Sequence, residues 1–181
     1  MRNTVLIGMR GCGKSSLGKV LAKKQGRPFI DTDILIEKAS GKSISQIVSE
    51  SGWEAFRDLE TTVCKKVGEK EGAVIAVGGG AILREENVVA LKKNGVLVFL
   101  NVPLSILEYR IRNGKKGHRP SLTGKNIAEE LREIWEARKQ YYHESANITF
   151  SVCEGGGSVS RQVRELLTLL QSFESICKES F

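Results

Sequence analysis

The residues Gly8-Met9-Arg10-Gly11-Cys12-Gly13-Lys14-Ser15 follow a short apolar run and match the pattern G-x-x-x-x-G-K-[ST] at every fixed position. Glycines allow backbone N–H groups to converge on phosphate oxygens, and a helix starting near Lys14 would direct its positive dipole end at them. The lysine of this pattern reaches the outer phosphates, and its serine ligates Mg²⁺. A chance glycine turn before a helix is the alternative. We predict a phosphate-binding loop whose nucleotide contacts are Gly11, Cys12, Gly13, Lys14, Ser15 and Ser16.

Two other nucleotide signatures are missing from the sequence. The dinucleotide pattern G-x-G-x-x-G needs a glycine three residues after its second glycine. That position holds Ser16 after Gly11-Cys12-Gly13 and Leu83 after Gly78-Gly79-Gly80, so the pattern fails. The guanine-specifying pattern Asn-Lys-x-Asp is also absent, which disfavours a switch GTPase. We therefore predict ATP, with Mg²⁺, as the nucleotide.

Short apolar runs recur on both sides of the phosphate loop. They are Val5–Ile7, Phe29–Ile30, Ala73–Val77, Val96–Leu100 and Ile148–Val152. Continuous rather than alternating runs are typical of parallel strands buried on both faces. Helical segments separate them, most clearly from Val159 to Phe173, where the apolar residues share one helical face. These elements predict an α/β fold with a five-stranded parallel sheet flanked by helices.

Composition limits the class of protein and its partners. The chain has 181 residues, 40% of them hydrophobic and 27% charged, which predicts a single folded domain over residues 1–181. The net charge of +7 favours anionic partners, but the lysine pairs are scattered without interleaved aromatics, so we expect no nucleic acid partner. The apolar runs are too short to span a membrane. We expect a monomer in the cytoplasm, with four reduced cysteines and no zinc site.

Two carboxylates follow the second apolar run. Because neither the third nor the fourth run ends in an acid, Asp31 is the best candidate to hold Mg²⁺ together with Ser15. Strand periodicity would turn Asp33 the same way as Asp31, so that it could accept or orient the proton of a hydroxyl. The alternative is that Asp33 caps a helix that starts at Ile34.

Three further features suggest how an acceptor is bound. The segment Phe56-Arg57-x-x-Glu60 is predicted to be helical, so Glu60 would hold the guanidinium of Arg57, unless the two form an isolated surface ion pair. The glycines Gly78, Gly79 and Gly80 would let an anion approach the backbone closely. Arg138 could offer a second guanidinium to a carboxylate.

Together these features resemble the shikimate kinase family, which has a P-loop fold like that of nucleoside-monophosphate kinases. The matching features occur in family order. They are the phosphate loop at 8–15, Phe29 to Asp33, Phe56 to Glu60, Gly78 to Gly80, Arg119-Pro120 followed by Ser121 to Lys125, and Arg138 with Tyr141.

The resemblance implies transfer of the γ-phosphoryl group of ATP to the 3-hydroxyl of shikimate, a step of chorismate and aromatic amino-acid biosynthesis. It implies that shikimate binds Asp33, Arg57, Gly78, Gly79, Gly80 and Arg138, with the two arginines on its carboxylate. Helices at about 33–62 would hold this acceptor. Arg112 would lie against the adenine. Arg119, in a lid loop at about 113–125, would close on the transferred phosphoryl group, so Lys14, Asp33 and Arg119 are the predicted catalytic residues.

One segment departs from the family pattern, and several alternatives remain open. Many relatives have a proline near the adenine, where this chain reads Cys153-Glu154-Gly155-Gly156-Gly157-Ser158, so the adenine contact from that loop is in doubt. Another small-molecule kinase of the same fold, acting on gluconate or a nucleotide, is the nearest alternative. A P-loop protein that remodels nucleic acid and a family member without catalysis are the others.

Overall fold

The computed structural model describes residues 1–113, 126–152 and 157–179. Its centre is a sheet of five parallel strands in the order β2-β3-β1-β4-β5. The strands are β1 (Asn3–Ile7), β2 (Phe29–Asp31), β3 (Val74–Ala76), β4 (Gly95–Asn101) and β5 (Ile148–Ser151). The predicted α/β class and the five parallel strands are confirmed, and the strand ends differ from the predicted ones by one or two residues.

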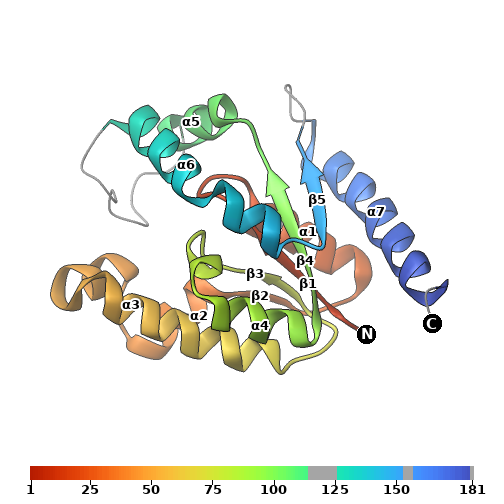
Figure 1. Ribbon diagram of the computed structural model, residues 1–181, viewed down its shortest axis with the longest axis horizontal. Helices are drawn as coiled ribbons and strands as arrows, with labels where there is room; N and C mark the ends of the chain where they lie inside the picture. The colour runs from red at the N-terminus through yellow and green to blue at the C-terminus, as the bar shows by residue number, and fades with distance from the viewer. Residues whose placement is uncertain (114–125, 153–156, 180–181) are drawn as a thin grey trace.

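Helices cover both faces of this sheet (Figure 1). They are α1 (Lys14–Gln25), α2 (Thr32–Ser40), α3 (Ile44–Gly68), α4 (Glu85–Lys93), α5 (Leu104–Asn113), α6 (Ile127–Ser145) and α7 (Val159–Glu179), with a 3₁₀ turn η1 (Ala81–Leu83). α1 packs against α7 on one face, whereas α4 and α6 contact β4 from the other, where α3 packs on α4. This is the layered arrangement that alternating strands and helices predict.

The first strand lies in the middle of the sheet because its last three residues are all apolar. Val5, Leu6 and Ile7 are completely buried, and so are Val74 and Val98 on the flanking strands β3 and β4. A strand covered on both faces needs this continuous apolar sequence. Consequently the loop that follows β1 opens at the centre of the carboxyl edge of the sheet, between the ends of β3 and β4.

Local sequence determines where α2 and α3 begin and bend. Asp31 caps α2, because its side chain accepts a hydrogen bond from the backbone N–H of Asp33. Ser43 and Gln46 form a reciprocal capping box at the start of α3. Gly52, at φ +80° and ψ 174°, interrupts α3 and kinks it. The second part of α3, residues 53–68, carries the Phe56-Arg57-x-x-Glu60 segment toward the carboxyl edge.

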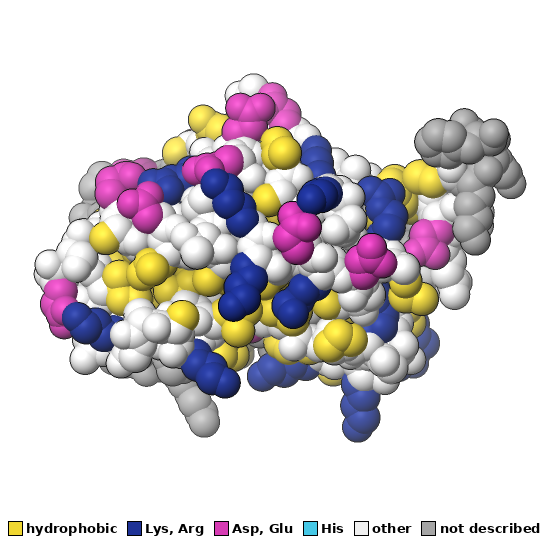
Figure 2. Space-filling view, turned by 90° about the horizontal axis from the view of Figure 1, so that it is seen from below, with side chains coloured by type: hydrophobic (Ala, Val, Ile, Leu, Met, Phe, Trp, Pro, Cys, Tyr) yellow, Lys and Arg dark blue, Asp and Glu magenta, His cyan; other side chains and the backbone are white. Residues whose placement is uncertain are grey.

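The surface mixes both signs of charge. Figure 2 shows one face on which Lys and Arg side chains stand dispersed among Asp and Glu, without a continuous basic track. None of the helices in the described part of the chain has the length and apolar character needed to cross a membrane. Among the same residues, Cys12, Cys64 and Cys177 are free thiols; Cys153 lies outside them.

Candidate active site

The loop between β1 and α1 has the backbone geometry of an anion cradle. Gly13 precedes α1 at φ +99°, in the left-handed region that favours glycine, and no side chain caps the first turn of the helix. The N–H groups at the start of α1 are therefore available to an anion, and the helix dipole adds to the attraction. The predicted helix start near Lys14 is confirmed.

Lys14 lies across this loop. Its Nζ donates to the carbonyl oxygens of Gly8 at 2.8 Å and Met9 at 3.0 Å. A second cation that the sequence analysis did not single out, Arg110 on α5, donates to the carbonyl oxygen of Cys12 at 3.1 Å from the other side. Nothing in the sequence pattern marks Arg110, because its partner is a main-chain oxygen 98 residues away. Two cations thus hold the loop through its carbonyl oxygens.

Ser15 and Asp31 meet at the edge of the same loop. The Ser15 hydroxyl donates to Oδ2 of Asp31 at 2.6 Å, which links the start of α1 to the end of β2. A hydroxyl oxygen and a carboxylate oxygen beside a phosphate cradle are hard ligands of the kind that Mg²⁺ prefers, with water and phosphate oxygens completing the octahedron. The residues present therefore fit the ion. The described residues contain no cluster of three His, Cys, Asp or Glu that would form an all-protein metal site.

Asp33 occupies a different local structure from the predicted one. Strand periodicity does not apply to it, because the chain turns into α2 at Thr32 and Asp33 lies in the first helical turn. The prediction that Asp33 caps a helix starting at Ile34 is also wrong, since Asp31 is the cap. The reason is that the Asp31 carboxylate lies within 3.1 Å of the Asp33 N–H and satisfies that donor two residues earlier. Asp33 itself is half-buried and lines the same cleft as Ser15 and Asp31.

Arg57 is oriented by a buried ion pair. Its Nη1 contacts Oε2 of Glu60 one turn further along α3, and the two side chains are 12% and 0% exposed, so this is not a surface pair. The rings of Trp53 and Phe56 flank the guanidinium, with centroids 5.7 and 5.2 Å from its central carbon. A guanidinium fixed in this way presents its remaining donors in one direction.

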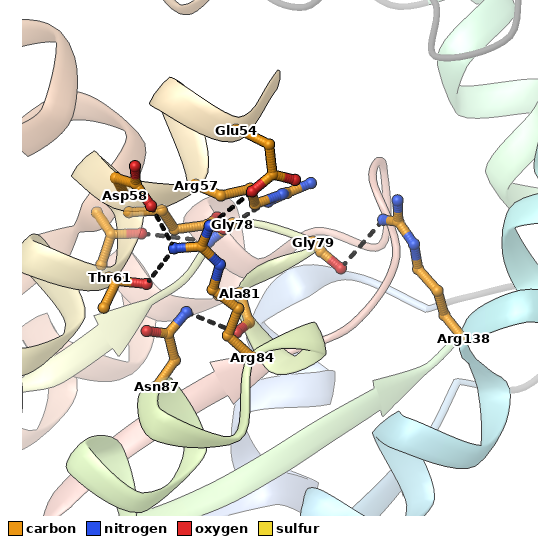
Figure 3. Close-up of polar contacts among 12 residues, drawn as sticks. Glu54, Arg57, Asp58, Thr61, Gly78, Gly79, Ala81, Arg84, Asn87 and Arg138 are labelled. Carbon is orange, nitrogen blue, oxygen red and sulfur yellow. Dashed lines mark hydrogen bonds and ion pairs between the residues drawn. The ribbon is translucent and has the colours of Figure 1, made fainter. Parts of the chain in front are cut away.

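A second arginine ties α3 to the start of α4 (Figure 3). Arg84 donates to Asp58 at 2.7 Å, Glu54 at 2.8 Å and the Thr61 hydroxyl at 3.3 Å. These three partners surround Arg57 along α3, so the clasp holds the helix segment that carries Arg57. Arg84 was not anticipated from the sequence, because its partners lie 23 to 30 residues away.

Gly78, Gly79 and Gly80, which follow β3, form a turn that Arg57 and Arg138 approach (Figure 3). A Cβ atom added at Gly80 would lie 2.3 Å from Nη2 of Arg57, so only glycine leaves the guanidinium its place. Gly78 donates its N–H to the Thr32 hydroxyl at 3.2 Å, and Asn87 donates to the carbonyl of Ala81 at 2.9 Å. These two hydrogen bonds fix both ends of the turn.

Arg138 reaches the same turn from α6. Its Nη1 donates to the Gly79 carbonyl at 3.4 Å, so Arg57 and Arg138 come from different helices to the two sides of one peptide unit. Burial lowers the pKa of Arg138, the nearby Tyr142 opposes that change, and the positive charge of Arg57 lowers the pKa further. Two guanidinium groups that repel one another across one turn favour an anion between them, although of this group only Gly79 lines the cleft described below.

Tyr142, rather than Tyr141, is the tyrosine that belongs to this group. Tyr142 is completely buried and donates its hydroxyl to the Gly79 carbonyl, whereas Tyr141 is 47% exposed. The spacing of four residues from Arg138 is the signal that could have identified Tyr142, because residues four apart share a helix face. His143, the next residue, is exposed.

Most of the predicted residues line one cleft of about 1080 Å³ along the carboxyl edge. It brings together residues 11–16 of the phosphate loop, Asp31, Asp33, Gly79 and Arg112. Arg112 is paired with Glu108 at 2.6 Å, and Gly157 and Gln162 line the cleft as well. The predicted lid residue Arg119 lies outside the described residues, as does most of the Cys153 to Ser158 loop.

Comparison with known protein families gives one consistent result. A family model described as shikimate kinase matches residues 10–171. A shikimate kinase of Nitratidesulfovibrio vulgaris is 40% identical over 166 residues, which are 91% of this chain and 93% of that protein. A shikimate kinase of Symbiobacterium thermophilum is 36% identical over 169 residues, covering 93% of this chain and 96% of that protein.

Solved structures agree with the sequence comparison. A shikimate kinase from Acinetobacter baumannii in complex with shikimate superposes with a TM-score of 0.89 at 32% identity, covering 95% of this chain and 94% of that one. A gluconokinase from Sinorhizobium meliloti superposes with a TM-score of 0.57 at 17% identity, covering 99% and 98%. At that identity the second likeness shows a shared fold alone.

Proposed function

Because the chain belongs to the shikimate kinase family, we propose that it transfers the γ-phosphoryl group of ATP to the 3-hydroxyl of shikimate, giving shikimate 3-phosphate and ADP. The reaction is a step of chorismate and aromatic amino-acid biosynthesis. One observation of the geometry carries the proposal: Arg57 and Arg138 flank the glycine turn beside the phosphate loop, where they suit an acceptor with a carboxylate.

The phosphate loop holds the donor. The uncapped N–H groups of residues 13–16 receive the phosphates of ATP, and Lys14 reaches from the loop carbonyls to the outer phosphate oxygens. Ser15 and Asp31 would hold Mg²⁺, which when bound neutralises charge on the phosphate oxygens. Arg112 lines the cleft, and the family resemblance assigns it to the adenine.

The acceptor lies across the cleft from the phosphates. Arg57 and Arg138 bind its carboxylate, and the backbone of Gly78 to Gly80 lies against its ring. Asp33, which lines the cleft, orients the 3-hydroxyl and accepts its proton as the oxygen attacks phosphorus. Phosphoryl transfer depends mainly on position and charge neutralisation, so this arrangement supplies what the reaction requires.

Arg119 and the surrounding lid loop at about 113–125 remain a prediction from the family resemblance. A lid that closes after both substrates bind would exclude the water that otherwise hydrolyses ATP. Because residues of a single chain line the cleft, we propose that the enzyme acts as a monomer. We also propose that it is cytoplasmic and has no nucleic acid partner, since the Lys and Arg side chains form no continuous track on the face that Figure 2 shows.

A coupled spectrophotometric assay of ADP release from MgATP tests the proposal. We expect release that depends on shikimate, and no acceptor-dependent release with gluconate or AMP at the same concentrations. Gluconate resembles shikimate in bearing a carboxylate and several hydroxyls, so it tests whether the two arginines alone select the acceptor. Release that depended on gluconate or AMP instead would overturn the assignment of shikimate while leaving the kinase fold in place.

A further inference from the structure

The buried phenol of Tyr142 contacts the acceptor side of the cleft although it does not itself line the cleft. Its ring stacks on Phe99 of β4, with ring centroids 5.0 Å apart and planes inclined by 4°. The side chain is completely buried, so the ring has one orientation and its hydroxyl points one way. That hydroxyl donates to the Gly79 carbonyl, 63 residues away in the sequence.

The peptide unit between Gly79 and Gly80 lies between the two arginines. On one side its carbonyl accepts from both Tyr142 and Arg138. On the other side Gly80 lies so close to Arg57 that an added Cβ would meet three guanidinium atoms within 2.6 Å. A rotation of this peptide unit would therefore move the carbonyl away from Tyr142 and Arg138, and a shift of Gly80 would bring its backbone against Arg57. The spacing of the two guanidinium groups depends on how this single peptide is oriented.

Of the two donors to the Gly79 carbonyl, only Tyr142 is fixed by its own packing. Arg138 lies at 3.4 Å, near the limit for a hydrogen bond, and its side chain has several rotatable bonds. Tyr142 is held by Phe99 and by burial. Burial also raises the pKa of the Tyr142 phenol, against the opposing effect of Arg138, so the hydroxyl keeps its proton and remains a donor at neutral pH.

We propose that Tyr142 is a positioning residue of the acceptor site, which fixes the Gly79 carbonyl and so sets the spacing between Arg57 and Arg138. The proposal rests on the proposed function, because it takes these two arginines as the carboxylate-binding pair. Tyr142 contacts neither substrate. Its contribution is to keep the fork of guanidinium donors matched to a carboxylate before shikimate arrives.

The test compares Tyr142→Phe with Tyr141→Phe, which removes the same atom from the neighbouring exposed side chain. Tyr142→Phe keeps the ring on Phe99 but removes the donor, so we expect the KM for shikimate to rise about tenfold. The KM for ATP should stay within about twofold, since in the described part of the chain this hydroxyl donates to the Gly79 carbonyl and not to the phosphate loop. Tyr141→Phe should leave all constants unchanged. Equal changes in the two KM values, or none in either, would overturn the proposal.

A double-mutant cycle then separates positioning from general stability. If Tyr142 acts through Gly79 and Arg138, its removal should weaken shikimate binding much less in an Arg138→Ala background than in the wild type. Additive losses would show that Tyr142 acts elsewhere. The wild-type enzyme in the same assay tests the proposed function separately from the role of Tyr142. If it phosphorylates an acceptor other than shikimate, the proposed function fails, whatever the variants do.

A second measurement needs no substitution at Tyr142. The chain has three tyrosines, of which Tyr109 and Tyr141 are exposed and Tyr142 is buried. In protein labelled with 3-fluorotyrosine, we expect the buried ¹⁹F resonance to shift on adding shikimate and the two exposed resonances to stay in place. Tyr109→Phe and Tyr141→Phe assign the signals. A buried resonance that did not respond to saturating shikimate would contradict the proposal even if Tyr142→Phe failed to fold.

Discussion

At the scale of single residues, the position of Asp33 separates its chemistry from the capping of α2. Asp31 satisfies the Asp33 N–H, so the Asp33 carboxylate is not needed to start the helix. Replacing it should therefore alter catalysis more than folding. The same distinction does not hold for Arg57, whose ion pair with Glu60 is part of the packing of α3.

Asp33→Asn should reduce kcat by roughly 10²- to 10⁴-fold, the usual contribution of a side chain that transfers a proton. Binding of MgATP should be preserved, because Asp33 is not among the residues assigned to the phosphates or to Mg²⁺. Steady-state kinetics and calorimetric titration with a nucleotide analogue measure the two effects. Asp58→Asn makes the same chemical change at a side chain that is 72% exposed, and its turnover should be normal. Unchanged turnover in Asp33→Asn would remove this residue from the reaction.

Arg57→Ala should weaken shikimate binding and also destabilise the fold. Without its cation, Glu60 is a completely buried carboxylate whose main charge partner is gone, and removing one member of a buried pair costs about 3 kcal/mol or more. Denaturant unfolding and the KM for shikimate measure the two losses. Arg84→Ala is the matched control, since the carboxylates it leaves are 88% and 72% exposed, and it should destabilise the protein less. A stable Arg57→Ala protein with normal shikimate affinity would contradict both assignments.

At the scale of elements, the turn between β3 and η1 is where three segments meet. α2 reaches it through Thr32, α4 through Asn87 and α6 through Arg138 and Tyr142. The turn therefore transmits the relative placement of these helices to the two arginines. Short turns seldom carry so many contacts from distant parts of the chain, and this one does so because its glycines leave room for them.

Gly80→Ala tests the turn directly. The new Cβ would displace the Arg57 guanidinium, so the KM for shikimate should rise at least about tenfold, as expected when a charged hydrogen bond is lost. Gly80 has φ −108°, which alanine also adopts, so the backbone is not strained, and any fall in the unfolding midpoint should come from disturbing the buried ion pair of Arg57 with Glu60. Gly79→Ala, whose Cβ would meet nothing closer than 3.4 Å, should have the smaller effect. Equal effects of the two substitutions would show that contact with Arg57 is not what matters.

At the scale of the whole molecule, the sequence was sufficient for features that depend on local pattern. Continuous apolar runs predicted the five parallel strands, and the spacing of the glycines, Lys14 and Ser15 predicted the loop at the centre of the sheet. Arg57 and Glu60 were paired correctly because three residues along a helix bring side chains together.

The rest depends on contacts between residues distant in the chain. Arg110 holds a phosphate-loop carbonyl 98 residues away, and Tyr142 holds the Gly79 carbonyl across 63 residues. Every residue has a main-chain carbonyl oxygen, so residue types do not indicate which one Arg110 or Tyr142 would contact. The helix start at Thr32 was missed for a different reason, since Asp31 and Asp33 are both acceptable caps and only the backbone geometry decides between them.

Because the donor and acceptor sites occupy one cleft that is built from several segments, ligand binding should stabilise the fold as a whole. At 100 times its Kd a ligand adds about 2.7 kcal/mol to the free energy of unfolding. For a chain of this size that corresponds to a rise in Tm of roughly 5 to 10 °C. We expect MgADP and shikimate each to raise the Tm measured by calorimetry, and ADP with a chelator to raise it less than MgADP.

The rise in Tm with MgADP, minus the rise with ADP and a chelator, measures the contribution of the metal site. Asp31→Asn should abolish this difference, because Asp31 and Ser15 supply the only protein oxygens assigned to Mg²⁺, whereas the increment from shikimate should remain. Glu37→Gln is the matched control: Glu37 lines the same cleft, but its Oε1 accepts from the Ile44 N–H, a bond that glutamine retains, so the metal increment should persist. If Asp31→Asn kept the full increment, another group would hold the ion, and the contact between Ser15 and Asp31 would serve only to join α1 to β2.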